Sequence, residues 1–202
     1  MIGTEIAQSE DLRMGRRLEY FTLAWNLAEA VVALAAGAFA TSIALIGFGI
    51  DSLIESLSGG ILLWRLQGVE AGAKRERLAH RLVGVSLFVL AAYVAFEAAK
   101  SLLHREEPEV SMVGIILSVV SLIVMPVLAR AKRRVAGRIS SRALIADSRQ
   151  TDICAYLSAV LLGGLLLNAL FGWWWADPVA ALCMVPMIFW EGIEAIRGES
   201  CC

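Results

Sequence analysis

The chain carries little charge for its length and little net charge of either sign. Asp, Glu, Lys and Arg make up 18% of its 202 residues, and the formal net charge is −1. A soluble domain of this size carries more charge, and a chain this close to neutral offers no electrostatic case for binding nucleic acid. With 58% hydrophobic residues and a mean hydropathy of +0.70, the sequence predicts an integral membrane protein.

Histidine and cysteine are scarce, and neither is arranged for catalysis or cross-linking. The two histidines, His80 and His104, fall at the ends of apolar stretches, where we expect them to be solvated. Of the four cysteines, Cys154 and Cys183 lie inside apolar stretches, and the spacing is not that of a disulfide framework. No H-E-x-x-H motif or Ser–His pair is placed for catalysis. We therefore expect neither an enzyme nor an organic cofactor.

Long apolar runs account for most of the sequence. A membrane-spanning helix needs about 20 mostly apolar residues. Six stretches meet this requirement, at 19–40, 41–64, 82–103, 110–128, 144–172 and 177–196. We see no soluble domain, low-complexity segment or clear internal repeat between them. The prediction is an all-α integral membrane protein with six transmembrane helices.

The basic residues are distributed unevenly between the two ends of these helices. Of the 18 Lys and Arg residues, only Lys100 and Arg105 fall on the side opposite the termini. Because basic residues concentrate on the cytoplasmic side, we expect both termini in the cytoplasm. Residues 1–17 would form a cytoplasmic N-terminal segment, 18–197 the six-helix transmembrane domain, and 198–202 a short cytoplasmic tail. The lipid bilayer is the first predicted partner, in a bacterial-type inner or plasma membrane.

Two acidic residues lie within the apolar stretch 41–64. Asp51 and Glu55 are one helical turn apart, so they point the same way along a helix. A carboxylate at membrane depth is costly, and such residues usually face a cavity, a partner or a permeating ion. Because no Lys or Arg lies nearby on this helix, the pair is poorly placed for a salt bridge. It is well placed to bind a divalent cation.

A second polar face is predicted on the helix at 144–172. With about 100° between successive residues, one side of this helix collects Asp147, Gln150, Thr151, Cys154 and Ser158. Asp152 points away from this side and toward Arg149, with which it could pair. We take Asp147, Thr151 and Cys154 as ligand candidates and Asp152 as a weaker one. Cys154 and Ser158 can equally serve helix packing.

Further ionisable residues lie on the first and last predicted helices. Asn26 and Glu29 are separated by less than one turn near the middle of 19–40. At that depth Glu29 could be a proton carrier, a ligand or a packing partner. Glu191 and Glu194 are close to the cytoplasmic end of the last helix, and we expect both to be solvated.

The donor types at these positions restrict the cation. Carboxylate oxygens suit hard cations, whereas a thiolate moves the preference toward zinc or cadmium. Zinc takes four tetrahedral ligands from Asp, Glu, His or Cys, and Asp51, Glu55, Asp147 and Cys154 would supply such a set from two helices. Ligands must be deprotonated to bind metal, so binding releases protons. This chemistry provides a route to metal–proton exchange.

These motifs resemble those of the cation diffusion facilitator, or cation efflux, family, and the resemblance covers nearly the whole chain. The family's D-x-x-x-D pair is represented by residues 51–55 (DSLIE). The opening of its A-D-x-x-H-x-x-x-D motif is represented by Ala146-Asp147, with Gln150 at the family's metal-binding His and Cys154 at its Asp. The Asp177-Pro178 opening of the last predicted helix is also similar.

The resemblance implies a secondary transporter that exports a divalent transition metal by alternating access, with protons as the counter-substrate. Asp51 and Glu55 would be ligands, and Asp147 would have the secondary role of the motif's first Asp. Zinc is the expected substrate, with cadmium, cobalt, manganese and iron as alternatives. The family's cytoplasmic C-terminal domain, used for dimerisation and regulation, has no counterpart in this sequence. We therefore expect a short, membrane-only branch and leave a homodimer open.

An alternative keeps the fold but not the transport. The family's His and Asp are replaced on the fifth predicted helix, which could mark a non-transporting membrane subunit that binds or modulates a partner protein. Asp51 and Glu55 would then pair with a basic residue of that partner. In either interpretation a set of polar residues remains as candidates for positioning ligands or coupling protons: Glu29, Asn26, Gln150, Thr151 and Asp152.

Overall fold

The computed structural model of the chain describes residues 2–66 and 73–197, with the side chains of 10–64, 81–141, 144–145 and 147–197. The predicted tail at 198–202 lies outside these residues. The described part consists of α1 (Ile2–Ala40), α2 (Ile43–Leu66), α3 (Ala73–His104), α4 (Met112–Ile139), α5 (Arg142–Phe171) and α6 (Ala176–Arg197), without strands. All six helices are long and apolar enough to cross a membrane. The prediction of a six-helix, multi-pass membrane protein is confirmed.

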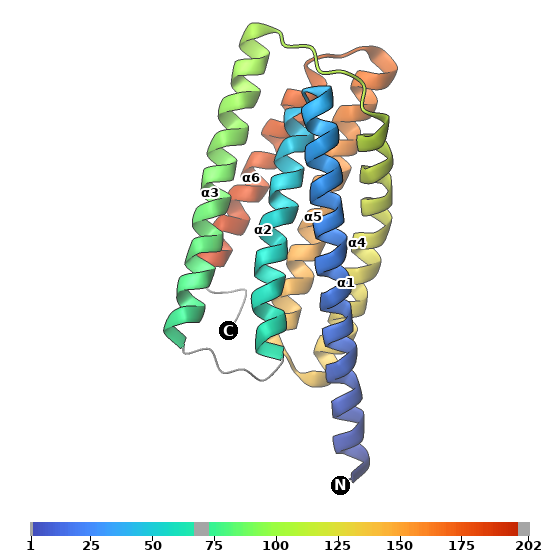
Figure 1. The fold of residues 1–202 in the computed structure, drawn as a ribbon, viewed down its shortest axis with the longest axis vertical. Helices are drawn as coiled ribbons and strands as arrows, with labels where there is room; N and C mark the ends of the chain where they lie inside the picture. Colours follow the sequence, from blue (N-terminus) through green and yellow to red (C-terminus); the bar gives the residue numbers. More distant parts are fainter. Residues whose placement is uncertain (1, 67–72, 198–202) are drawn as a thin grey trace.

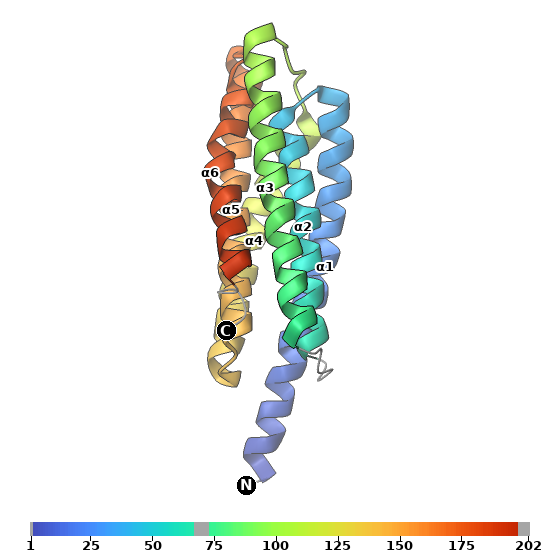
Figure 2. The ribbon, with the colours of Figure 1, turned by 90° about the vertical axis from the view of Figure 1, so that its left-hand side faces the viewer.

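The helices run up and down in one elongated bundle (Figure 1), so that the start of α1 and the end of α6 lie at the same end. The most extensive contacts join α1 to α2, α3 to α6 and α4 to α5. Figure 2 shows α3 and α6 side by side, with the first turns of α1 extending beyond the bundle. We refer to the end that holds the first turns of α1 as the basic end, because Arg13, Arg16 and Arg17 gather there.

Several helices extend further toward the basic end than the apolar runs predict. The sequence predicts that the fourth span stops at 128, but α4 continues to Ile139. Lys, Arg and Ala are good helix formers, and the helix ends only at Ser140, whose backbone is left-handed with φ 53°. Ser141 then caps α5, since its side chain accepts a hydrogen bond from the backbone N–H of Leu144. About three turns of largely basic sequence therefore extend a spanning helix without a break.

At the opposite end of the bundle, Asp177 of α6 holds the start of α2. Its carboxylate accepts a hydrogen bond from the Ser42 hydroxyl and from the backbone N–H groups of Ile43, at 2.9 Å, and Ala44, at 3.4 Å. The first N–H groups of a helix have no partner within it, and a carboxylate there also complements the helix dipole. This contact fixes the position of α2 relative to α6.

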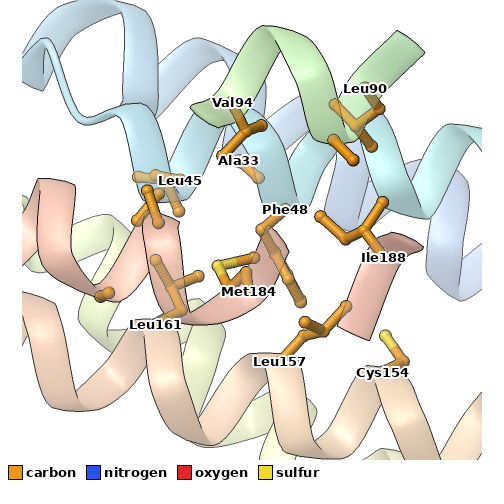
Figure 3. Packing of buried hydrophobic residues seen from close by; sticks show 14 of the residues in the cluster. Ala33, Leu45, Phe48, Leu90, Val94, Cys154, Leu157, Leu161, Met184 and Ile188 are labelled. Atoms are coloured by element: carbon orange, nitrogen blue, oxygen red, sulfur yellow. The ribbon is translucent and has the colours of Figure 1, made fainter. Parts of the chain in front are cut away.

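The apolar core draws on all six helices, and one layer of it lies where α2, α5 and α6 meet (Figure 3). Phe48 of α2 packs among Leu157 of α5 and Met184 and Ile188 of α6, and all four side chains are fully buried. Between helices in lipid, close van der Waals packing replaces water exclusion as the source of cohesion. This layer sets the level of the polar residues described next, which lie one turn nearer the basic end on each helix.

Candidate metal centre

The predicted pair on α2 points into the bundle. Asp51 is 1% exposed and Glu55 is 6% exposed. One oxygen of Glu55, Oε2, accepts a hydrogen bond of 3.0 Å from the side-chain amide of Asn26 on α1. Its other oxygen and both oxygens of Asp51 have no hydrogen-bond partner in the described part of the chain. Three of the four carboxylate oxygens of the pair are therefore buried and unpartnered.

A third carboxylate joins the pair from α1. Glu29 is 1% exposed, and its Oε2 accepts a hydrogen bond of 3.1 Å from the Ser52 hydroxyl. The Cys154 thiol of α5 points to the same oxygen at 3.9 Å. These contacts connect α1, α2 and α5 at one level of the bundle. We call Glu29, Asp51 and Glu55 the acidic cluster.

The members of the acidic cluster are electrostatic neighbours. Asp51 and Glu29 both lie close enough to Glu55 to interact with it electrostatically, and Glu29 interacts with Asp51 in the same way. The hydrogen bonds that reach the cluster come from neutral groups, namely the side chains of Asn26, Ser52 and Cys154. Burying carboxylates with unpartnered oxygens is costly unless a proton or a cation neutralises them. The cluster is therefore a place where a cation would gain several oxygen donors.

The structure brings Cys154 to the acidic cluster but places Asp147 elsewhere. Asp147 pairs with Lys132 of α4, and the same ammonium lies 3.3 Å from Glu19 of α1 and 3.3 Å from the Thr151 hydroxyl. Lys132 is fully buried. This buried ion-pair network lies about two turns from Cys154 toward the basic end. Of the four predicted ligands, Asp51, Glu55 and Cys154 thus share one region, and Asp147 is held by a cation.

Two other polar residues of α5 make no hydrogen bond or ion pair with the acidic cluster in the described part of the chain. Asp152 pairs with Arg133 of α4, not with Arg149 as the helix geometry suggested, because α4 continues past residue 128 and brings Arg133 alongside. Both side chains are partly exposed, at 31% and 43%. Gln150 is half-buried.

The expectation that Glu191 is solvated is wrong. Its side chain is 4% exposed, and neither oxygen has a hydrogen-bond partner in the described residues. Glu194 instead accepts a hydrogen bond of 3.0 Å from the Trp190 indole. A signal for this was present in the sequence, since Glu191 follows the buried Ile188 and Met184 at spacings of three and seven residues, which place all three on one helix face.

The candidate ligand side chains are not gathered at one point in this structure. In the described part of the chain, no three His, Cys, Asp or Glu side chains lie close enough together to hold one metal ion. A cation bound here would have to draw the carboxylates and the thiol inward.

The fold and its ionisable interior define a multi-pass helical membrane protein whose polar residues meet in the bundle. Comparison with known families is specific: a model of the cation efflux transmembrane domain matches residues 20–199. The chain belongs to the cation efflux family, and the resemblance deduced from its motifs is confirmed.

Individual relatives are distant. An uncharacterised transporter of Synechocystis is 27% identical over 189 residues, covering 88% of this chain and 61% of that protein. Transmembrane protein 163 of Xenopus laevis is 25% identical over 182 residues, covering 89% and 65%. The cation-efflux pump FieF of Shewanella oneidensis is 28% identical over 109 residues, covering 54% and 36%. The chain thus spans less than two thirds of the length of each of these relatives.

Proposed function

We propose that the chain moves a divalent transition-metal cation, zinc first among them, out of the cytoplasm in exchange for protons. Asp51 and Glu55 would be the central ligands, with Cys154 completing the site from α5 and Glu29 adjoining it from α1. The observation that carries the proposal is the set of buried, unpartnered carboxylate oxygens on Asp51 and Glu55. Membership of the cation efflux family supports the same class of substrate.

The donor set favours a borderline or soft divalent metal. Carboxylates alone would suit magnesium or calcium, but the Cys154 thiol beside Glu29 shifts the preference toward zinc or cadmium. Cobalt, manganese and iron are the other candidates. Asp147, the remaining predicted ligand, would have to leave Lys132 before it could contribute.

Proton exchange follows from the same ligands. Carboxyl and thiol groups bind metal only when deprotonated, so a cation entering the site displaces protons and protons returning displace the cation. Asn26 and Ser52 would orient Glu55 and Glu29 for this exchange through the bonds that they donate. Rocking of the helices would expose the site to each side in turn. The basic end would face the cytoplasm, with residues 1–17 and 198–202 on that side.

A second candidate is the non-transporting subunit. It is favoured by the absence, within the described residues, of three ligand side chains already gathered at one point, and by the pairing of Asp147 with Lys132. In that case the acidic cluster would bind a partner's basic residue, not a metal.

The test is metal-dependent stabilisation of the purified protein. A ligand that binds only the folded state raises apparent stability by an amount set by its concentration relative to its Kd. Zinc and cadmium should raise the melting temperature of the wild type but not of Asp51→Ala. Magnesium is the matched control, and it should have little effect at equal concentration. If no divalent metal stabilises a folded wild-type protein, the subunit interpretation replaces the transporter.

A further inference from the structure

Glu191 is a buried acidic side chain on α6 that the proposed site does not use. Its side chain is 4% exposed, and within the described residues both of its oxygens lack a hydrogen-bond partner. The next acid on the same helix, Glu194, bonds to Trp190 and is only half-buried. A membrane helix that needed only a packing residue at position 191 would gain nothing from a carboxylate there.

Three helices place Glu191 at the level of the acidic cluster. Ile188 of α6 packs in the same layer as Phe48 of α2 and Leu157 of α5 (Figure 3). One turn from that layer toward the basic end, each helix carries a ligand-type side chain. These are Asp51 on α2, Cys154 on α5 and Glu191 on α6.

The electrostatic neighbours of Glu191 agree with this placement. Asp51, Glu55 and Glu194 lie close enough to Glu191 to interact with its carboxyl group electrostatically. Glu191 has the same kind of interaction with the Cys154 thiol. Lys132, a fully buried cation, is bonded to Asp147 and Thr151 on α5. The pairing that would explain a buried carboxylate as a purely structural feature is therefore absent among the described contacts of Glu191.

Next to Glu191, α6 packs tightly against α3. A methyl group added at Gly84 of α3 would come within 2.8 Å of the carbonyl oxygen of Gly192, the residue after Glu191. Only glycine allows the two backbones to approach this closely. The backbone next to Glu191 is therefore packed closely against α3.

We infer that Glu191 is a cation-coordinating residue, which adds a carboxylate from α6 to the donors of Asp51, Glu55 and Cys154. This inference rests on the proposed function and extends the site to α6. It supplies a carboxylate beside Asp51, Glu55 and Cys154 while Asp147 is held by Lys132. With three carboxylates and one thiol, the site would take a divalent transition metal in a four-coordinate arrangement.

The experiment measures Zn²⁺ and Co²⁺ binding to the purified full chain by titration calorimetry. Glu191→Gln should weaken Kd by about tenfold or more, the size typical of losing a ligand or its support. Glu194→Gln is the matched control and should bind like the wild type. Glu191→Asp keeps the carboxylate and should restore most of the lost affinity.

Visible absorption of bound Co²⁺ separates coordination from a merely structural effect, because the spectrum depends on coordination geometry. Glu191→Asp should change the spectrum at saturation, even if Glu191→Gln fails to fold, whereas Glu194→Asp should not. If the wild type binds cations, Asp51→Ala does not, and the Glu191 variants match the wild type in both Kd and spectrum, the Glu191 inference alone is overturned. A folded wild type that binds no cation overturns the proposed function and this inference together.

Discussion

The fully buried Lys132 of α4 pairs with Asp147 of α5, which is 12% exposed, and with the fully buried Glu19 of α1. The network lies between the acidic cluster and the basic end of the bundle. It ties together three helices with one ammonium group. A change that withdraws Lys132 would leave two carboxylates facing each other without a cation.

Replacing Lys132 should therefore be strongly destabilising. Removing one partner of a buried ion pair typically costs about 3–5 kcal/mol, and we expect Lys132→Met to lower the free energy of unfolding by that order. Reversible unfolding in mixed detergent micelles would measure it. Arg133→Met is the control, because the Arg133–Asp152 pair is partly exposed and such pairs contribute about 1 kcal/mol or less. Equal effects of the two substitutions would contradict the role of Lys132 as a partner in a buried ion pair.

Replacing the Asp51 carboxylate should stabilise the protein, in contrast to the replacement of Lys132. Its two buried oxygens are unpartnered in the described structure, and an unsatisfied buried polar group costs about 1–3 kcal/mol, more when it is charged. Asp51→Asn should thus raise the unfolding free energy when a chelator removes divalent metals. The neighbouring Ser52→Ala loses the bond to Glu29 and should lower it by about 1 kcal/mol. A loss of stability in Asp51→Asn would show that Asp51 has a structural partner.

Much of this arrangement can be predicted from the sequence. The features that cannot be predicted depend on contacts between helices. The six spans and the Asp51–Glu55 pair follow from apolar run length and helical spacing within one segment. The burial of Lys132 does not follow from the sequence in this way, because the positive-inside rule treats every Lys after an apolar run as a surface residue. Its partners lie on α1 and α5. Glu191 was recoverable from its spacing to Ile188, but its proximity to a span end favoured solvation.

The Asn26 amide should tune the site without being a ligand. It donates to Glu55 at 3.0 Å, and groups that orient a metal ligand typically contribute about 10–100-fold in affinity. Asn26→Ala should weaken Zn²⁺ binding toward the lower end of that range, measured by calorimetry. Thr22→Ala lies one turn earlier on α1 and loses only a bond to the backbone of its own helix, so its affinity should match the wild type. Unchanged affinity in Asn26→Ala would remove Asn26 from the site.

Asp177 should control the order of the first turn of α2. Asp177→Ala removes the acceptor for Ser42 and for the backbone N–H of Ile43 and Ala44. Losing a helix cap costs about 0.5–2 kcal/mol, and amide hydrogen exchange at residues 43–46 should accelerate accordingly. Asp152→Ala, which breaks a partly exposed pair, should leave that exchange unchanged. Protection that persists in Asp177→Ala would mean that another group holds the start of α2.

Metal transport by this chain can be measured as metal flux into proteoliposomes that contain the purified protein. We expect saturable uptake of Zn²⁺ or Cd²⁺ that increases when the lumen is acidic, because protons leaving the vesicle exchange for entering metal. Asp51→Ala, shown to be folded, should abolish that uptake, since it removes the proposed ligand whose buried oxygens have no partner among the described residues. Uptake by Asp51→Ala at the wild-type rate would show that Asp51 is not needed for transport, and no uptake of any divalent metal by a folded wild-type protein would show that the chain is not a metal transporter.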